Sequence, residues 1–448
     1  MNSHTGSSFT VPFIRAWRSR TAWNVVSRAF PLLIAILLCV VSLRAEQPRD
    51  NKWNGDNQTL RALMERIDRL EVRNAQLEAR VAQLEAGQKA PRAKLASVPA
   101  ESGMLPQAED KAQAEPAEPE RMDLSKTLLR IRGFGDVSLH GDNKKGDTTS
   151  FSLGELNLFV TSDISEKFKF LSEIVFESEG ANNRFKVEPE RLLVQYSYNN
   201  HLNLAAGRYH TAIGYYNTAY HHSTWFQTTT GRPFLFEFED EGGILPIHNV
   251  GVSASGLIPS GQLGLHYVAE VGNGRASRSP LSAPVQNAVD ENNHKAVNLA
   301  LFARPDSISG LQLGFSAYRD VLTPLNAPRI GETILAGHAV YISSTFEWLN
   351  EALVIRHAPQ GAPGFDTPGF YTQLSKAFGS YRPYFRYQYV NGSDLEPVFP
   401  QVGLRHGPSV GLRYDASESV ALKLQYDYTA LRRQPAINGL ALQVGFTF

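Results

Sequence analysis

The sequence holds a single cysteine in 448 residues and no surplus charge of either sign, with 44 Lys and Arg against 44 Asp and Glu. One cysteine excludes a disulfide framework and any four-thiolate metal or iron–sulfur site. Balanced charge lacks the basic surplus of a typical nucleic-acid binder. No apolar run near 20 residues follows the N-terminus, which excludes a multi-span helical membrane protein. A membrane β-barrel is still allowed, because alternating strands average to mild hydrophilicity, and the mean hydropathy is -0.27.

Residues 1–45 have the layout of a secretory signal peptide. Several arginines precede the apolar stretch Pro31–Leu43, which is short for a bilayer span, and Ala45 supplies a small residue at the expected cleavage point. An uncleaved anchor is the alternative. Cleavage removes Cys39, so the mature chain has no cysteine, which suits an oxidising compartment.

Residues 57–87 are predicted to form an α-helical coiled coil in the periplasm. Their apolar residues keep a 3-4 spacing over about four heptads, with Arg at the g positions and Glu at the e positions. Such charges pair between parallel helices, which predicts a homo-oligomer, and the a and d residues favour a dimer. The core positions are Leu60, Leu63, Ile67, Leu70, Asn74, Leu77, Val81 and Leu84.

Residues 88–122 are mostly Ala, Pro, Glu, Gln and Lys with few large apolar groups. A segment of this composition cannot bury enough apolar surface to order itself, so a disordered linker is predicted. The rest of the chain, residues 123–448, has a different pattern.

Apolar and polar residues alternate with a period of two through residues 123–448, and turn residues separate the alternating stretches. About sixteen such stretches occur, an even number at about 20 residues per strand and connection, which is typical of an outer-membrane barrel. We therefore predict an all-β fold, a transmembrane antiparallel β-barrel of about 16 strands preceded by the coiled coil. The stretches are 129–140, 151–161, 167–176, 190–198, 202–208, 248–256, 262–271, 296–303, 311–319, 333–343, 346–356, 370–377, 381–389, 408–414, 420–428 and 440–448.

A soluble sandwich or propeller would also give short alternating strands. The composition of the polar face favours the membrane barrel, because it mixes charged residues with Gly, Ser and Ala, as a wet lumen would. Aromatic pairs near strand ends, such as Tyr387 with Tyr389 and Tyr426 with Tyr428, suit the interfacial girdles of such a barrel, and the chain ends on Phe448.

The signal, heptads, linker and barrel together resemble Gram-negative porins. The segment 207–214, Gly-Arg-Tyr-His-Thr-Ala-Ile-Gly, follows an alternating strand and is similar to the phosphate-selective porin O/P family. A coiled coil before the barrel also resembles some trimeric porins for small anions. These resemblances imply a trimer and passive uptake of anions such as phosphate or dicarboxylates.

Ion selectivity in a porin depends on charges that face the lumen. Residues 123–448 contain 27 Lys and Arg against 30 Asp and Glu, so bulk charge does not favour anions, although a local ladder of cations would. A mixed, solvated wall is the alternative. The candidate lumen-facing cations are Arg130, Arg132, Lys167, Lys169, Arg191, Arg382, Arg386, Arg413 and Lys423. The candidate anions are Asp136, Glu155, Glu173, Glu177, Asp415 and Asp427.

The longest irregular stretch, residues 210–247, is too long for an ordinary connection. It is predicted to be either a constriction loop inside the pore or an extracellular cap. Its acidic run, 237–241, fits a solvated face or a cation site near lipopolysaccharide. The constriction-loop candidates are Tyr215, Tyr216, His221, His222, Arg232, Glu237, Glu239 and Asp240.

Three histidines, His210, His221 and His222, raise a metal hypothesis, but they lack the i,i+4 spacing that aligns two rings. No metal site and no cofactor are therefore predicted. A hydrolase would need Ser223 activated by its neighbour His222, yet adjacent residues rarely present both groups to one substrate. We predict a non-enzymatic chain without catalytic residues.

The sequence thus predicts an outer-membrane porin for passive diffusion of small hydrophilic solutes. Its expected partners are its own copies, outer-membrane lipid, lipopolysaccharide and the solute, with no nucleic acid. The alternative is an envelope structural protein whose stalk engages peptidoglycan while the barrel serves as an anchor. A barrel enzyme is the third hypothesis.

Overall fold

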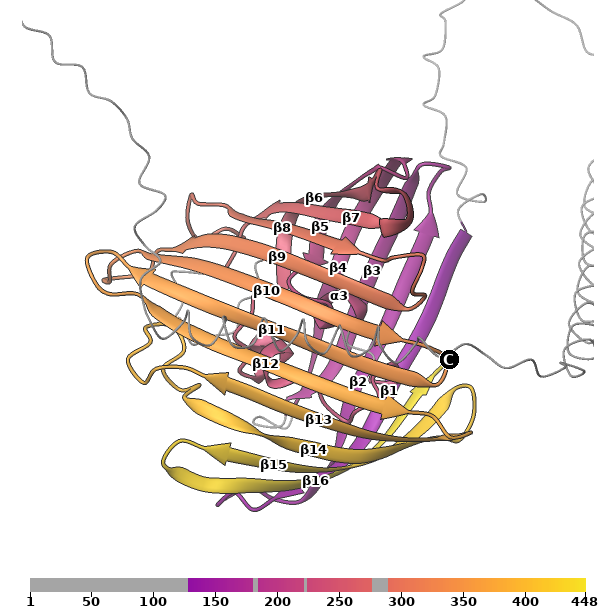
Figure 1. The fold of residues 1–448 in the computed structure, drawn as a ribbon, viewed down its shortest axis with the longest axis vertical. Coiled ribbons are helices and arrows are strands. Elements are labelled where there is room, and N and C mark those ends of the chain that lie inside the picture. Colours follow the sequence, from indigo (N-terminus) through magenta and orange to yellow (C-terminus); the bar gives the residue numbers. More distant parts are fainter. Residues whose placement is uncertain (1–127, 180–183, 221–223, 276–288) are drawn as a thin grey trace, which may run out of the picture. The chain divides into compact units, whose positions relative to one another are not determined.

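The alternating stretches fold into sixteen strands that close into one antiparallel barrel (Figure 1). A computed structural model describes residues 128–179, 184–220, 224–275 and 289–448. The predicted signal peptide, coiled coil and linker lie outside these residues. The chain divides into two units, Met1–Arg121 and Met122–Phe448, and only the second contains described residues.

Each strand pairs with its sequence neighbours, and β1 pairs with β16 to close the barrel. Each of the sixteen predicted stretches overlaps one strand, which confirms the predicted strand count and the all-β class. The strands are β1 (Leu128–Asp142), β2 (Ser150–Asp163), β3 (Phe168–Glu179), β4 (Arg184–Asn199), β5 (Leu202–His210), β6 (His248–Ile258), β7 (Leu265–Gly272), β8 (Ala296–Ala303), β9 (Leu311–Leu322), β10 (Ile330–Ile342), β11 (Phe346–Pro359), β12 (Phe365–Lys376), β13 (Tyr381–Asn391), β14 (Leu404–Asp415), β15 (Val420–Leu431) and β16 (Gln434–Thr447).

The two ends of the barrel differ in their connections. Short turns such as 164–167 and 416–419 lie at one end, called here the short-turn end, together with Leu128 and Phe448. The connections that follow odd-numbered strands lie at the other, long-loop end, and they include 211–247 and 392–403. Among the described residues, no helix is long and apolar enough to cross a bilayer.

Aromatic rings from the end of the chain cover glycines at the closing seam. Gly135 lies opposite Phe446, and a Cβ atom on Gly133 would overlap the ring of Phe448. The backbone of Phe448 also exchanges two hydrogen bonds with Gly133, at 2.9 and 3.0 Å. Glycine on one strand and a large ring on its partner thus fit together at the point where the barrel closes.

Strand alternation gives the barrel two different faces. In β11, Glu347, Leu349 and Glu351 are buried and point toward the interior, while Trp348 and Asn350 alternate with them on the outside. The outer face carries many exposed apolar side chains, including Val252, Leu299, Phe315, Val410 and Leu440. An apolar exterior around a closed sheet is the arrangement that a lipid environment favours.

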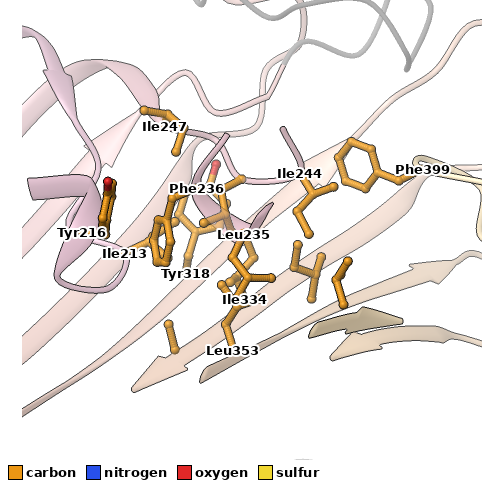
Figure 2. Packing of buried hydrophobic residues seen from close by; sticks show 14 of the residues in the cluster. Ile213, Tyr216, Leu235, Phe236, Ile244, Ile247, Tyr318, Ile334, Leu353 and Phe399 are labelled. Carbon is orange, nitrogen blue, oxygen red and sulfur yellow. The ribbon is translucent and has the colours of Figure 1, made fainter. Parts of the chain in front are cut away.

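Part of the inner face is apolar, which differs from the polar lumen wall that the sequence suggested. Ile334 on β10 and Leu349 and Leu353 on β11 are buried inside the barrel. They pack with Leu235 and Phe236 from the 211–247 connection, as Figure 2 shows for most of this cluster. The inner wall is apolar here because a segment of chain, rather than water, covers it.

Candidate functional site: a loop inside the barrel

Residues 211–247, called here the inner loop, connect β5 to β6, and their described parts, 211–220 and 224–247, lie inside the barrel. The loop contains a short helix, α3 (Tyr216–Ala219), and two 3-10 turns, η3 (Phe234–Phe236) and η4 (Glu239–Glu241). Only a segment in the interior can contact inner-face residues on several strands that are not neighbours. Backbone N–H groups of the loop donate to side chains on β7, β11, β13 and β15, namely Glu270, Glu351, Gln388 and Gln425.

Glu351 of β11 holds the start of α3. Its carboxylate accepts the backbone N–H of Tyr215 at 2.5 Å and that of Tyr216 at 2.8 Å, and it also accepts the hydroxyl of Tyr371 at 2.7 Å. The first N–H groups of a helix have no partner within the helix, so a buried carboxylate satisfies them. Burial raises the pKa of Tyr216 to about 12, so this hydroxyl stays neutral.

Three of the predicted lumen cations hold the inner loop by its carbonyl oxygens. Lys423 donates to Thr224 O at 2.5 Å and to Thr229 O at 2.9 Å. Arg386 donates to Gly231 O at 2.8 Å. Arg413 donates to Trp225 O at 2.7 Å and to Gln227 O at 3.0 Å. These charges bind the protein's own backbone, so their role in the structure is to position the loop.

The other predicted cations fall into two groups. Arg191 pairs with Glu173 at 2.5 Å, Arg130 pairs with Asp163 at 3.2 Å, and Arg382 donates to Ser375 at 3.3 Å. The second group, Arg132, Lys167 and Lys169, is exposed near the short-turn end. A continuous ladder of cations through the interior is therefore replaced by loop anchors, paired charges and an exposed basic group at one mouth.

The predicted anions are also engaged in local contacts. Asp415 pairs with Arg413 at 2.7 Å, and Glu177 pairs with Lys186 at 2.5 Å. Asp136 accepts the backbone N–H of Glu155 at 3.1 Å and the amide of Gln443 at 3.0 Å. Asp427 accepts the hydroxyl of Ser409 at 2.5 Å and the amide of Gln425 at 2.9 Å.

Within the inner loop, Arg232 is the centre of a buried cluster. Its guanidinium lies 4.1 Å from the ring of Phe238 and 5.2 Å from that of Tyr216, and it donates to Tyr220 O at 3.0 Å. Burial lowers the pKa of Arg232 from its ordinary value. Cation–π contacts of this kind tie the two halves of the loop together.

The acidic run of the loop is not a uniformly solvated face. Glu237 pairs with Arg405 of β14 at 2.9 Å, and burial raises the pKa of Glu237 despite that arginine. Glu239 faces His248, and although burial acts against ionisation, the histidine lowers the pKa of Glu239. Asp240 lies in η4, whereas His221, His222 and Ser223 fall outside the described residues.

Sequence reasoning missed a second connection that reaches into the interior, residues 392–403 between β13 and β14. Glu396 accepts a hydrogen bond from His357 of β11 at 2.5 Å, and the opposite ring nitrogen of His357 lies 3.0 Å from Glu332. Val398 and Phe399 join the same buried cluster as the inner loop. The apolar Val-Phe pair after Glu396 was the available signal, but the short length of the connection hid it.

The sequence was also compared with known proteins. Neither the models of protein families nor the curated proteins contain a match. The structure is similar to OmpF of Salmonella typhi in complex with daunomycin, with a TM-score of 0.51, 11% identity, and coverage of 71% of this chain and 97% of that one. It is similar to an anion-selective porin from Comamonas acidovorans, with a TM-score of 0.50, 12% identity, and coverage of 72% and 100%.

A third similar structure is the outer membrane channel DcaP of Acinetobacter baumannii, with a TM-score of 0.50, 11% identity, and coverage of 72% of this chain and 98% of that one. All three matches span nearly the whole of the other chain. At these identities the likeness is one of fold. The described residues, which begin at Leu128, therefore share the closed barrel architecture of Gram-negative outer-membrane porins and channels.

Proposed function

We propose that this protein is an outer-membrane channel for passive diffusion of small hydrophilic solutes. The observation that carries the proposal is the inner loop, which crosses the interior of a closed barrel and is held there by hydrogen bonds with β7, β11 and β13 to β16. A loop fixed across the interior narrows the passage without a moving part. The apolar outer face and the fold likeness to porins support the location in the outer membrane.

The proposal extends to a weak preference for anions such as phosphate or dicarboxylates. Because Arg386, Arg413 and Lys423 bind the loop, the preference would come from Arg132, Lys167 and Lys169 at the short-turn mouth. Exposed charges at a mouth are screened by salt within about 10 Å at 0.1 M, so the preference should be modest and strongest at low ionic strength.

Planar-bilayer recording tests both the proposed channel function and the proposed preference for anions. We expect discrete conductance steps, and reversal potentials in chloride, phosphate and succinate gradients that show a small anion preference. A triple variant, Arg132→Gln with Lys167→Gln and Lys169→Gln, should abolish the preference and keep the steps, whereas Lys145→Gln at the other end should change neither. An unchanged reversal potential in the triple variant would refute the assignment of selectivity to this mouth.

We further propose that the coiled coil assembles the chains as a homo-oligomer, which the resemblance to coiled-coil porins suggests is a trimer. The alternative function, an envelope structural protein that engages peptidoglycan through the stalk, predicts a folded barrel without conductance. Recordings that show no steps from correctly folded protein would favour this alternative.

A further inference from the structure

Two arginines point outward from the barrel near its long-loop end. Arg319 of β9 and Arg356 of β11 both pair in register with Thr333 of β10, and the three strands are neighbours (Figure 1). These three side chains, called here the arginine row, lie on the outer face, because the residues on either side of each along its strand are buried. Cations on the lipid-facing side of a barrel are costly unless they lie near the membrane boundary.

The arginine row lies at the height expected for that boundary. Trp348 has an outer-face position near the start of β11 and marks the short-turn side of the apolar band, since tryptophan favours membrane interfaces. Arg356 lies eight residues further along the same face, from 348 to 356. That spacing is roughly 27 Å along a strand, or about 21 Å along the membrane normal at a tilt of about 40°. An apolar band is about 25 Å tall, so the row lies at the opposite interface.

Both guanidinium groups lean away from the apolar band. A Cβ atom on Gly331 would lie 2.7 Å from Nη2 of Arg319, and one on Gly364 would lie 3.0 Å from Nη2 of Arg356. Each glycine lies nearer to the long-loop end than the strand position opposite its arginine. The two side chains therefore extend along the surface toward that end, which keeps their charges on the polar side of the boundary.

The donors of the arginine row are only partly used within the protein. Arg319 donates from Nη1 to Oγ1 of Thr333 at 2.5 Å and to the backbone oxygen of Glu332 at 3.4 Å, and no carboxylate of the described residues pairs with it. Arg356 donates from Nη1 to both carboxylate oxygens of Asp366, at 2.8 and 3.0 Å, which fixes its side chain. Two guanidinium groups beside one carboxylate leave a net positive charge.

We propose that the arginine row binds a phosphate group of an outer-leaflet lipid of the lipopolysaccharide class, a phosphorylated glycolipid. Guanidinium groups donate paired hydrogen bonds to phosphate oxygens, and the hydroxyl of Thr333 can donate a further one. In outer-membrane barrels the short turns face the periplasm and the longer loops face outward. The row therefore faces the leaflet in which this lipid lies.

The surface beside the row suits the rest of a lipid molecule. The next outward positions toward the short-turn end are apolar, and they form a second row across the same strands, Ala317, Leu335 and Val354. Acyl chains would lie against this row while the phosphate meets the arginines. Charge above an apolar surface fits an amphipathic lipid better than a free anion.

This inference rests on the proposed location in the outer membrane but not on conduction. It is tested by native mass spectrometry of the full chain, folded in detergent and titrated with bisphosphorylated or with dephosphorylated lipid A. We expect the unchanged protein to bind the phosphorylated form at least about tenfold more tightly. The double variant Arg319→Gln with Arg356→Gln should lose this preference, and a preference equal to that of the unchanged protein would overturn the proposal.

An excess of inorganic phosphate distinguishes a lipid from a free anion. Phosphate should not displace the bound lipid A, because it lacks acyl chains. Complete displacement would overturn the assignment to a lipid.

A matched control removes two exposed cations that lie outside the arginine row, one near each end of the barrel. Lys145→Gln with Lys376→Gln should keep the preference, and its loss there would show general charge attraction and overturn the site. Heat-modifiable migration on a semi-native gel verifies that each variant has folded. Bilayer recording separates this inference from the proposed function: conductance steps from a protein that does not prefer phosphorylated lipid A would refute the arginine row and leave the channel.

Discussion

At the scale of single residues, strand alternation predicted which face a side chain would take but not which partner it would meet. Lys423 and Arg386 lie on the inner face, as the period of two requires. Their partners are backbone carbonyl oxygens of the inner loop. Every residue has a carbonyl group, so such a partner leaves no mark in the sequence. Strand alternation thus gives the face on which these cations lie but not their contacts, and the predicted ladder of cations along the pore stays a prediction.

Replacing Lys423 with Met should loosen the inner loop. Two carbonyl oxygens lose a charged donor, which weakens the docking of the loop by about 2 kcal/mol. We expect noisier and larger single-channel conductance, and faster cleavage of the loop by a protease in a folded barrel. Lys376→Met, at the exposed end of β12, serves as the matched control and should behave like the unchanged protein.

Replacing Glu239 with Gln tests the electrostatics of its contact with His248 at the base of the inner loop. Because His248 lowers the pKa of Glu239 below the ordinary value of 4.5, its stabilisation is present above pH 4.5 and is lost as the pH falls through the folded-state pKa. Glu239→Gln should therefore destabilise the protein by about 2 kcal/mol at pH 7 and by much less near pH 3. Denaturant unfolding at both pH values measures this, and an equal loss at both would contradict it.

At the scale of elements, the period of two located every strand because the outer face is consistently apolar. The predicted strand boundaries agree less well with the structure than the strand count does. The stretch predicted to begin at residue 262 instead opens with a 3-10 turn, η5 (Gly261–Leu263), and β7 begins at Leu265. Gly261 and Gly264 have φ angles of 56° and 57°, a conformation that suits glycine and delays the strand.

The inner loop was predictable in length but not in position. A long connection rich in aromatic residues fits a constriction loop and an extracellular cap equally well. The position of the loop is decided by the apolar inner face of β10 and β11. The sequence analysis assigned these apolar residues to strands, but it offered no reason for them to face the interior. The contact between Glu190 and His248, at 2.8 Å, was hidden for a related reason. A bulge between β3 and β4 beside Glu190 and Arg191 interrupts the register there, and sequence alternation does not reveal such a bulge.

The aromatic rings at the seam between β1 and β16 are expected to stabilise the closed barrel. Phe446→Ala with Phe448→Ala removes the rings that cover Gly133 and Gly135, which should weaken the pairing of β1 with β16 by roughly 0.5–1 kcal/mol per ring. The temperature at which the folded band disappears on a semi-native gel should fall. Phe315→Ala, an exposed ring on the outer face away from the seam, should leave it nearly unchanged. A fall of the same size in this control would show that the seam is not special.

At the scale of the whole molecule, the predicted coiled coil and the barrel are expected to make separate contributions, the first to assembly and the second to conduction. Deleting residues 57–87 should lower the stability of the oligomer, since the predicted coiled coil supplies paired heptads from each chain. On a semi-native gel the deleted form should shift toward monomer at lower temperature, while the conductance of each barrel persists. Migration equal to that of the full chain would mean that the stalk does not assemble the protein.

The apolar patch on the inner wall has a consequence for attempts to widen the passage. If the inner loop were deleted, the apolar side chains of Ile334, Leu349 and Leu353 would be exposed to water in the channel, which is unfavourable. A hydrophobic constriction can lose its water and stop conducting ions even where it is wide enough to admit a hydrated ion. A barrel without the inner loop should therefore close intermittently instead of showing a higher steady conductance. Polar substitutions on that wall would be needed to keep the channel filled with water.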